Sequence, residues 1–153
     1  MLSKVKACVL QGIEGCIVEV ETDISKGLPG FQIVGLPDVS IKESKERVRS
    51  AVKNSGYRFP VSKITVNLAP ANIRKDGSQM DLPIAVGILV AGSVIVEDLE
   101  EEVCFLGELS LDGRITEING ALPLVISLRN NGIKKVILPY NNKEECVLWI
   151  ILR

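Results

Sequence analysis

The feature that most limits how this chain can fold is the apolar run DLPIAVGILVAGSVIV, which extends from residue 81 to residue 96. No run in the sequence reaches the ~20 apolar residues that a transmembrane helix needs. The run is therefore expected to form a helix buried in the core of a globular domain. Asp81 is well placed to cap the N-terminus of this helix, and Pro83 is tolerated in its first turn.

Strand patterns precede this run. Residues 3–11 and 16–24 are rich in Val, Ile and Thr and flank the turn sequence GIEG, which predicts a hairpin. The sequence FQIVGL predicts a short third strand, and SKITVNLAP, which ends at Pro70, predicts a fourth. A polar loop, ANIRKDG, then leads to the apolar run, and loops of this kind often carry functional residues.

A helix is expected between the third and fourth strands, in the sequence PDVSIKESKERVRSAVKNSG. Ser40 and Glu43 have the spacing of a capping box, although Asp38 could cap the helix instead. Gly56 marks its C-terminal end. The helix is rich in basic residues, which makes it one candidate for a binding surface.

The sequence after the apolar run predicts six further features. EDLEEE predicts an exposed acidic linker, and VCFLGELSLDGRITEI predicts a hairpin with a two-residue turn at Asp112-Gly113. NGALPLVISLRNNG predicts a helix that ends at Gly132, and IKKVILP predicts a buried strand. NNKEE is expected to open a last helix. The apolar tail CVLWIILR is expected either to complete the core or to belong to a longer chain.

This order of elements predicts the fold class. Strands, a helix, a strand, a helix, a hairpin, a helix and a strand follow one another, which favours an α/β fold, specifically an α+β two-layer sandwich with helices packed on a mixed sheet. The 153 residues are enough for one domain with a core, and 46% apolar and 24% charged residues are typical of a soluble globular protein. Residues 1–153 are therefore expected to form a single domain.

Several kinds of site are disfavoured by composition. The chain has no histidine, which removes imidazole catalysis and His-ligated metal sites. The four cysteines are Cys8, Cys16, Cys104 and Cys146. They form no CxxC pair, and the N-terminus lacks a signal sequence, so buried thiols in a reducing cytoplasm are expected, without a metal site.

A phosphate-binding P-loop is also disfavoured. GFQIVGLP has the required glycine spacing, but Leu36 and Pro37 replace the Lys and Ser/Thr of the motif. GELSLDGR has five residues between its glycines rather than four. No ATP site is therefore expected in this chain.

Ser78 is the candidate nucleophile. It lies in a glycine-containing loop before a helix N-terminus, whose dipole could stabilise an oxyanion. Without histidine its base would have to be a lysine, and Lys75 is near in sequence. The simpler interpretation is that Ser78 bonds the loop backbone. Asp76 and Asp81 could form an acid/base pair, but a turn residue and a helix cap explain them equally well.

The distribution of charge predicts a modest basic face. Residues 1–80 carry 12 Lys and Arg against 8 Asp and Glu, whereas residues 81–153 carry 6 against 11. This asymmetry is weaker than in a dedicated nucleic-acid-binding protein. No aromatic residues are interleaved with the basic ones, so sequence-specific recognition of single strands is not predicted.

Four motifs resemble one protein family and occur in its order: GLPGFQIVGLPD, ESKERVRSAV, NLAPANIRKDGS and DLPIA. They resemble the N-terminal domain of the Mg-chelatase-like AAA+ family, the ComM or YifB group, from the first strand to about Pro139. The resemblance implies the ribosomal protein S-five domain 2-like fold, which the Lon protease domain and the RadA C-terminal domain share. FLGELSLDGRI and NNGIKKVILPYNN look like the corresponding Lon segments.

The similarity to Lon bears on Ser78. Lon has the pattern KDGPSAG around its serine, and an ungapped comparison with KDGSQMD puts Gln79 at the nucleophile position, although a shift of one residue restores Ser78. The lysine of Lon lies in a segment like IGGLKEK, which is INGALPL here, so Leu122 takes its place. An apolar side chain cannot act as a base. Lys134 and Lys135 lie beyond the helix, and the resemblance therefore implies a loop without Ser–Lys chemistry.

The resemblance also implies a function. Full-length members carry an ATPase module after this domain and are implicated in DNA recombination, as hexameric helicases acting on branched DNA during natural transformation. This chain would be a non-catalytic accessory domain of such a protein, with no cofactor of its own, and ATP and Mg²⁺ would serve only the ATPase module. Its expected partners are DNA, bound weakly and without sequence preference, and other copies of the protein. No membrane association is expected, and the expected location is the cytoplasm.

Two sets of residues are expected to carry this function. Neutralisation of DNA phosphates, or contact with a partner, is predicted for Arg47, Arg49, Lys53, Arg58, Arg74 and Lys75. The residues expected to shape the loop and cap the buried helix are Asp76, Gly77, Ser78 and Asp81. Two alternatives stay open: a Lon-like peptidase using Ser78 with a lysine brought in by folding, and a stand-alone oligomerisation domain.

Overall fold

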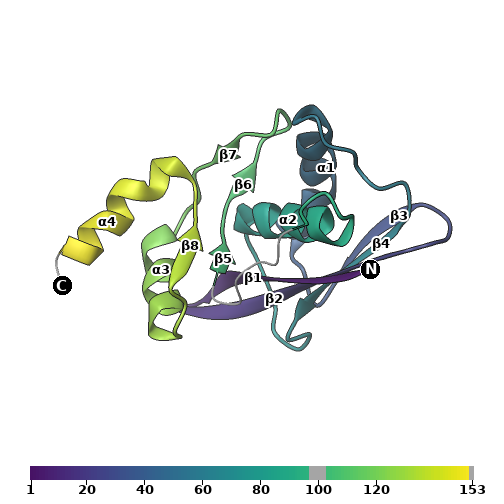
Figure 1. Cartoon of the computed structure of the whole chain (residues 1–153). Helices are drawn as coiled ribbons and strands as arrows, with labels where there is room; N and C mark the ends of the chain where they lie inside the picture. Colours follow the sequence, from purple (N-terminus) through teal and green to yellow (C-terminus); the bar gives the residue numbers. More distant parts are fainter. Residues whose placement is uncertain (97–102, 152–153) are drawn as a thin grey trace.

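The first two strands form a long antiparallel hairpin, as predicted (Figure 1). In the computed structural model, which describes residues 1–96 and 103–151, β1 (Leu2–Gln11) pairs with β2 (Glu14–Ser25) along its whole length. Gln11 is paired with Glu14, so the turn between the strands has two residues, the first of which is Gly12 with φ +65°. The predicted acidic linker, residues 97–102, lies outside the described residues.

The remaining elements follow in an order close to the predicted one. They are β3 (Gly30–Val34), α1 (Val39–Asn54), β4 (Lys63–Ala69), the short 3-10 helix η1 (Ser78–Met80), α2 (Asp81–Ala91), β5 (Val103–Phe105), β6 (Glu108–Leu109), β7 (Ile115–Thr116), α3 (Ala121–Asn130), β8 (Lys135–Ile137), the 3-10 helix η2 (Tyr140–Asn142) and α4 (Lys143–Ile151). The predicted last helix is therefore confirmed, whereas the packing of the apolar tail from residue 148 onward lies outside the described side chains.

The sheet is mixed, as predicted, and its strand order is β3-β4-β2-β1-β5-β8. The β1–β2 and β2–β4 pairs are antiparallel, and the β3–β4, β1–β5 and β5–β8 pairs are parallel. β8 lies at one edge of the sheet, and only the middle one of its three residues is partly buried. The prediction of a buried strand there is wrong, because an edge strand has a neighbour on one side only.

Helices cover both faces of the sheet. Side chains alternate between the faces of a strand, and Val5, Ala7 and Val9 of β1 belong to the cluster that includes the buried side chains of α1 and α2. Cys8 points to the opposite face, into a second cluster with Leu124 and other residues of α3. The α/β class is confirmed, but the two-layer description is wrong near β1, where α3 adds a third layer (Figure 1).

Two local predictions need correction. The predicted two-residue turn at Asp112-Gly113 is wrong, because the N–H of Ser110 donates to the carbonyl oxygen of Arg114 at 3.0 Å and leaves three residues in the turn. The helix in the apolar run ends at Ala91, where the N–H of Gly92 donates to the carbonyl oxygen of Ile88 at 2.8 Å. The run therefore forms a buried helix that is shorter than predicted.

α1 begins where the alternative cap predicted it. The N–H of Ile41 donates to Oδ1 of Asp38 at 2.9 Å, which makes Asp38 the N-cap. Ser40 does not form the capping box, because its hydroxyl donates to the Asp38 carboxylate at 2.8 Å. The buried side chains of α1 face α2 and the sheet, and the opposite side of the helix is left for polar and charged residues.

Candidate functional site

The loop between β4 and α2 is fixed to the connection between β3 and α1. The backbone N–H of Lys75 donates to the carbonyl oxygen of Leu36 at 3.0 Å, and the N–H of Asp38 donates to the carbonyl oxygen of Lys75 at 2.9 Å. These bonds pair residues 36–38 with residue 75 in the manner of a short parallel bridge. The candidate loop is therefore held beside the N-terminus of α1.

Lys75 is buried, with no exposed surface. Its Nζ donates to the carbonyl oxygen of Gly35 at 2.8 Å and to that of Pro70. Burial lowers the pKa of this ammonium group from its ordinary value. The prediction that Lys75 contacts DNA at the surface is wrong, because its charge is directed inward and ties three segments of the chain together.

Asp81 is buried and is the centre of a polar network. Its carboxylate accepts hydrogen bonds from Nε of Arg47 at 2.7 Å, from the hydroxyl of Ser44 at 2.5 Å and from the backbone N–H of Leu109 at 3.1 Å. The N-cap of α2 is Met80, without a side-chain cap, so the predicted capping role of Asp81 is wrong. The carboxylate instead joins α1, α2 and β6.

Arg47 belongs to the same network. Its side chain is 21% exposed, and Nη2 donates to the carbonyl oxygen of Ser40 at 2.7 Å in addition to the bonds with Asp81. The hydrogen bond that Arg47 donates to Asp81 is the main cause that raises the pKa of Arg47. The interior of the domain already binds the guanidinium group of Arg47, which is partly exposed, and its contact with DNA or a partner stays a prediction.

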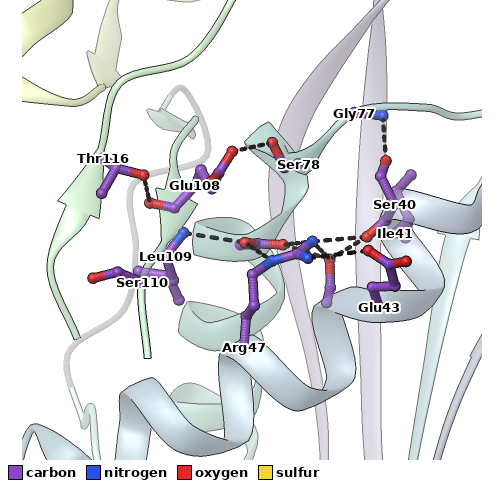
Figure 2. A network of polar contacts seen from close by, with 12 residues as sticks. Ser40, Ile41, Glu43, Arg47, Gly77, Ser78, Glu108, Leu109, Ser110 and Thr116 are labelled. Atoms are coloured by element: carbon purple, nitrogen blue, oxygen red, sulfur yellow. Dashed lines mark hydrogen bonds and ion pairs between the residues drawn. The ribbon is translucent and has the colours of Figure 1, made fainter. Parts of the chain in front are cut away.

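Ser78 interacts with a carboxylate rather than with an amine. Its hydroxyl donates to Oε2 of Glu108 on β6 at 2.5 Å, so it does not bond the loop backbone as the simpler interpretation supposed (Figure 2). Gln79, at the other possible nucleophile position, is buried, and its Nε2 donates to the carbonyl oxygen of Asp76 at 2.9 Å. Leu122, at the lysine position of Lon, lies in the first turn of α3.

The loop-shaping roles are divided between backbone and side chains. Gly77 has φ +102° and donates its N–H to the hydroxyl of Ser40 at 3.2 Å. A Cβ at Gly77 would lie 1.9 Å from Oε1 of Gln79, so a side chain there would force the Gln79 amide group to move. Asp76 is exposed and contributes to the loop through its carbonyl oxygen.

The remaining predicted contact residues lie at the surface. Lys53, Arg58 and Arg74 are exposed, and the half-buried Arg49 places its guanidinium carbon 5.5 Å from the centre of the Phe59 ring. α1 also carries Lys42 and Lys45, and spacings of three and four residues align four cations on one side of the helix. This basic stripe consists of Lys42, Lys45, Arg49 and Lys53. Contact with DNA stays a prediction for Arg49 and Lys53 of the stripe and for Arg58 and Arg74.

The thiols are not arranged for chemistry. All four cysteines are free; Cys8, Cys104 and Cys146 are buried, as predicted, whereas Cys16 is half-buried. Burial raises the pKa of Cys8 to about 12 and also raises those of Cys104 and Cys146. Within residues 1–96 and 103–151, no three His, Cys, Asp or Glu side chains are grouped so that they could hold a metal ion.

Sequence reasoning missed Glu108 and Ser44. Each contacts its partner in the network from more than 25 residues away along the chain, and neither has a local pattern that marks it.

The described helices include none that is long and apolar enough to cross a membrane.

Comparison with known proteins places this chain in a family. Residues 20–142 match the family model described as subunit ChlI of Mg-chelatase. The chain is 41% identical over 144 residues to the protein YifB of Escherichia coli, and this match covers 94% of the chain and 28% of YifB. It is 38% identical over 133 residues to the competence protein ComM of Haemophilus influenzae, with 87% of the chain and 26% of ComM covered.

A more distant similarity extends to Lon. The chain is 32% identical over 146 residues to Lon protease 2 of Bacillus subtilis, with 85% of the chain and 26% of that protease covered. The chain therefore spans less than a third of the length of the curated relatives that it matches. The match across most of the chain shows that this protein belongs to the family of the ChlI subunit of Mg-chelatase and is homologous to the N-terminal region of YifB and ComM.

Proposed function

We propose that this domain is a non-catalytic accessory part of a ComM-like, ATP-dependent DNA-processing protein, and that it contacts DNA phosphates through the basic stripe of α1. ATP and Mg²⁺ would be bound by residues outside this chain. The fold proposed for the domain is the ribosomal protein S-five domain 2-like fold of the Lon protease domain, which the distant similarity to Lon supports.

The arrangement of the loop before α2 supports a role without peptidase chemistry. A Ser–Lys enzyme needs a neutral amine within hydrogen-bonding distance of the serine hydroxyl. Here the hydroxyl of Ser78 donates to Glu108, and the only lysine in the loop donates its ammonium protons to two carbonyl oxygens. The serine hydroxyl and the lysine amine that a dyad would need for catalysis are thus used to stabilise the loop.

The observation that carries the DNA part is the division of cations on α1. Arg47 turns inward to Asp81, whereas the basic stripe combines the exposed Lys42 and Lys53 with the half-buried Lys45 and Arg49. A 16-residue helix is ~24 Å long, so the stripe can follow several consecutive phosphates of one strand. Glu43 and Glu46 lie on the same helix and are exposed, which favours weak rather than tight binding.

Fluorescence anisotropy with a labelled duplex of arbitrary sequence tests the proposal. Binding should be detectable at low salt, should not depend on sequence, and should weaken by about 0.9 log units per phosphate contact for each tenfold rise in salt. Absence of binding at low salt would defeat the DNA part. The self-association predicted for the family would then be the role to test, by light scattering.

A further inference from the structure

The turn between β3 and α1 holds a leucine in an unusual backbone conformation. Leu36 has φ +58°, in the left-handed region that residues with a Cβ rarely occupy. Its side chain is 52% exposed, so burial of the side chain does not explain this conformation. A non-glycine residue held in this region at the surface is a recognised mark of functional sites.

The turn is held by contacts with two other segments of the chain, the loop at Lys75 and strand β4. The carbonyl oxygen of Leu36 accepts from the backbone N–H of Lys75, and the carbonyl oxygen of Gly35 accepts from Nζ of the same residue at 2.8 Å. A Cβ at Gly35 would lie 2.3 Å from the carbonyl oxygen of Leu68, so the preceding backbone packs directly on β4. Leu36 therefore projects from a fixed support, and the backbone of the turn does not need to be ordered on binding.

The surroundings of Leu36 combine apolar and cationic side chains. Val39, in the first turn of α1, is 69% exposed, and Lys42 follows it at the i+3 position on the same side of the helix. Arg74 precedes the buried Lys75 in the strand-like segment that pairs with the turn, and it is exposed. Asp76, which follows Lys75, is also exposed, and its carboxylate would repel an anionic partner.

We propose that Leu36 acts as a wedge that inserts between two base pairs of duplex DNA, while Arg74 and Lys42 hold the phosphates that border the opened step. Aliphatic side chains inserted in this way unstack the bases and kink the duplex, and the cost is offset by contacts of flanking cations. The inference deepens the proposed function, on which it rests. A duplex matches the site because each base step is bordered by phosphates, just as the exposed leucine is bordered by cations.

Base unstacking can be measured separately from binding. A duplex with 2-aminopurine at its centre is mixed with the chain at low salt, and both anisotropy of an end label and 2-aminopurine emission are recorded. The wild-type chain should raise the emission by about twofold or more on saturation, because the probe brightens when it leaves the stack. Leu36→Ala and Leu36→Gly should remove this rise at saturating protein, and glycine also fits the left-handed backbone.

The matched control is Leu28→Ala, which removes a leucine that is 90% exposed in the loop between β2 and β3. It should keep the full rise in emission, and Asp76→Asn should increase the affinity. Binding of the wild-type chain without any rise in emission would overturn the wedge and leave the proposed phosphate contacts intact. A rise in emission that persists in Leu36→Ala would also overturn the wedge. So would Leu36 variants that keep the full rise in emission and change only the sedimentation of the protein without DNA. Absence of DNA binding would overturn both proposals.

Discussion

Arg47 and Asp81 join α1 to the first residue of α2 through a hydrogen bond of 2.7 Å between Nε and the carboxylate. The carboxylate is fully buried, whereas the guanidinium group is partly exposed. The pair links the helix that carries the basic stripe to the helix that follows the candidate loop. It therefore sets the position of one predicted functional element relative to the other.

Removal of either partner should destabilise the domain strongly. Arg47→Met leaves a buried carboxylate without its counter-ion and should lower the free energy of unfolding by about 3 kcal/mol. The double variant Arg47→Met, Asp81→Asn should lose less than the sum of the single losses, with a coupling of about 1–3 kcal/mol. Urea denaturation of the four proteins measures this coupling.

The ion pair between Arg47 and Glu43 provides the control for that cycle. Its atoms are 3.6 Å apart and the Glu43 side chain is 64% exposed, so Glu43→Gln should change stability by less than about 0.5 kcal/mol. Additive losses in the Arg47 and Asp81 cycle would contradict the network described here.

Lys75 should give the domain a characteristic dependence on pH. Burial lowers the pKa of this lysine below its ordinary value of 10.5 in the folded state, so above that lowered pKa the unfolded chain binds more protons than the folded one. The free energy of unfolding should consequently rise with pH between the lowered pKa and 10.5. Lys75→Met should be less stable at neutral pH, because two carbonyl oxygens lose a donor, and should lack this rise.

The measurement is the difference in urea midpoint between wild type and Lys75→Met across this alkaline range. Lys53→Met, at an exposed lysine, controls for the loss of one positive charge. Parallel pH profiles for wild type and Lys75→Met would show that the buried ammonium group does not titrate differently in the folded state.

Ser78 should not behave as an activated nucleophile. A fluorophosphonate reagent should leave the chain unlabelled, because the hydroxyl donates to a carboxylate, that of Glu108, rather than to an amine base. Ser78→Ala should lose about 1 kcal/mol of stability through this hydrogen bond. Labelling of the wild-type chain that disappears in Ser78→Ala would support the Lon-like peptidase alternative.

The backbone at Leu36 predicts opposite effects for two substitutions. Leu36→Val should cost about 1–2 kcal/mol, since a β-branched residue is poorly compatible with the left-handed conformation. Leu36→Gly should be neutral or stabilising, because glycine adopts φ +58° without a steric penalty. Thermal denaturation separates the two, and equal destabilisation by both would contradict the strained turn.

Periodic patterns predicted the main elements because they depend on neighbouring residues. The alternation around the turn at Gly12 predicted the hairpin, and the apolar run predicted a buried helix. The failures concern tertiary contacts. Asp81 has the position of an N-cap in the sequence, but a partly exposed arginine and a buried serine from α1 are stronger partners for its carboxylate than the free N–H groups of α2.

The candidate site shows the same limit. Arg74 and Lys75 are neighbouring basic residues that the sequence does not distinguish. Only the pairing of their segment with residues 36–38 decides that one side chain points inward and the other outward. Glu108 is 30 residues from Ser78, so no local spacing could predict that these two side chains interact. The absence of the Lon lysine could be predicted, because comparison of the INGALPL segment with Lon places Leu122 at that position.

The basic stripe is the central claim, and charge removal tests it most directly. Lys42, Lys45, Arg49 and Lys53 are replaced together by glutamine, and the control replaces four lysines on the strands and in the loop after β2, namely Lys4, Lys6, Lys26 and Lys63. Both variants have the same net charge. The salt dependence of duplex binding is then measured by anisotropy. The stripe variant should lose about 3–4 from the magnitude of the log–log slope, and the control should keep the wild-type slope. Equal losses in the two variants would contradict binding through α1.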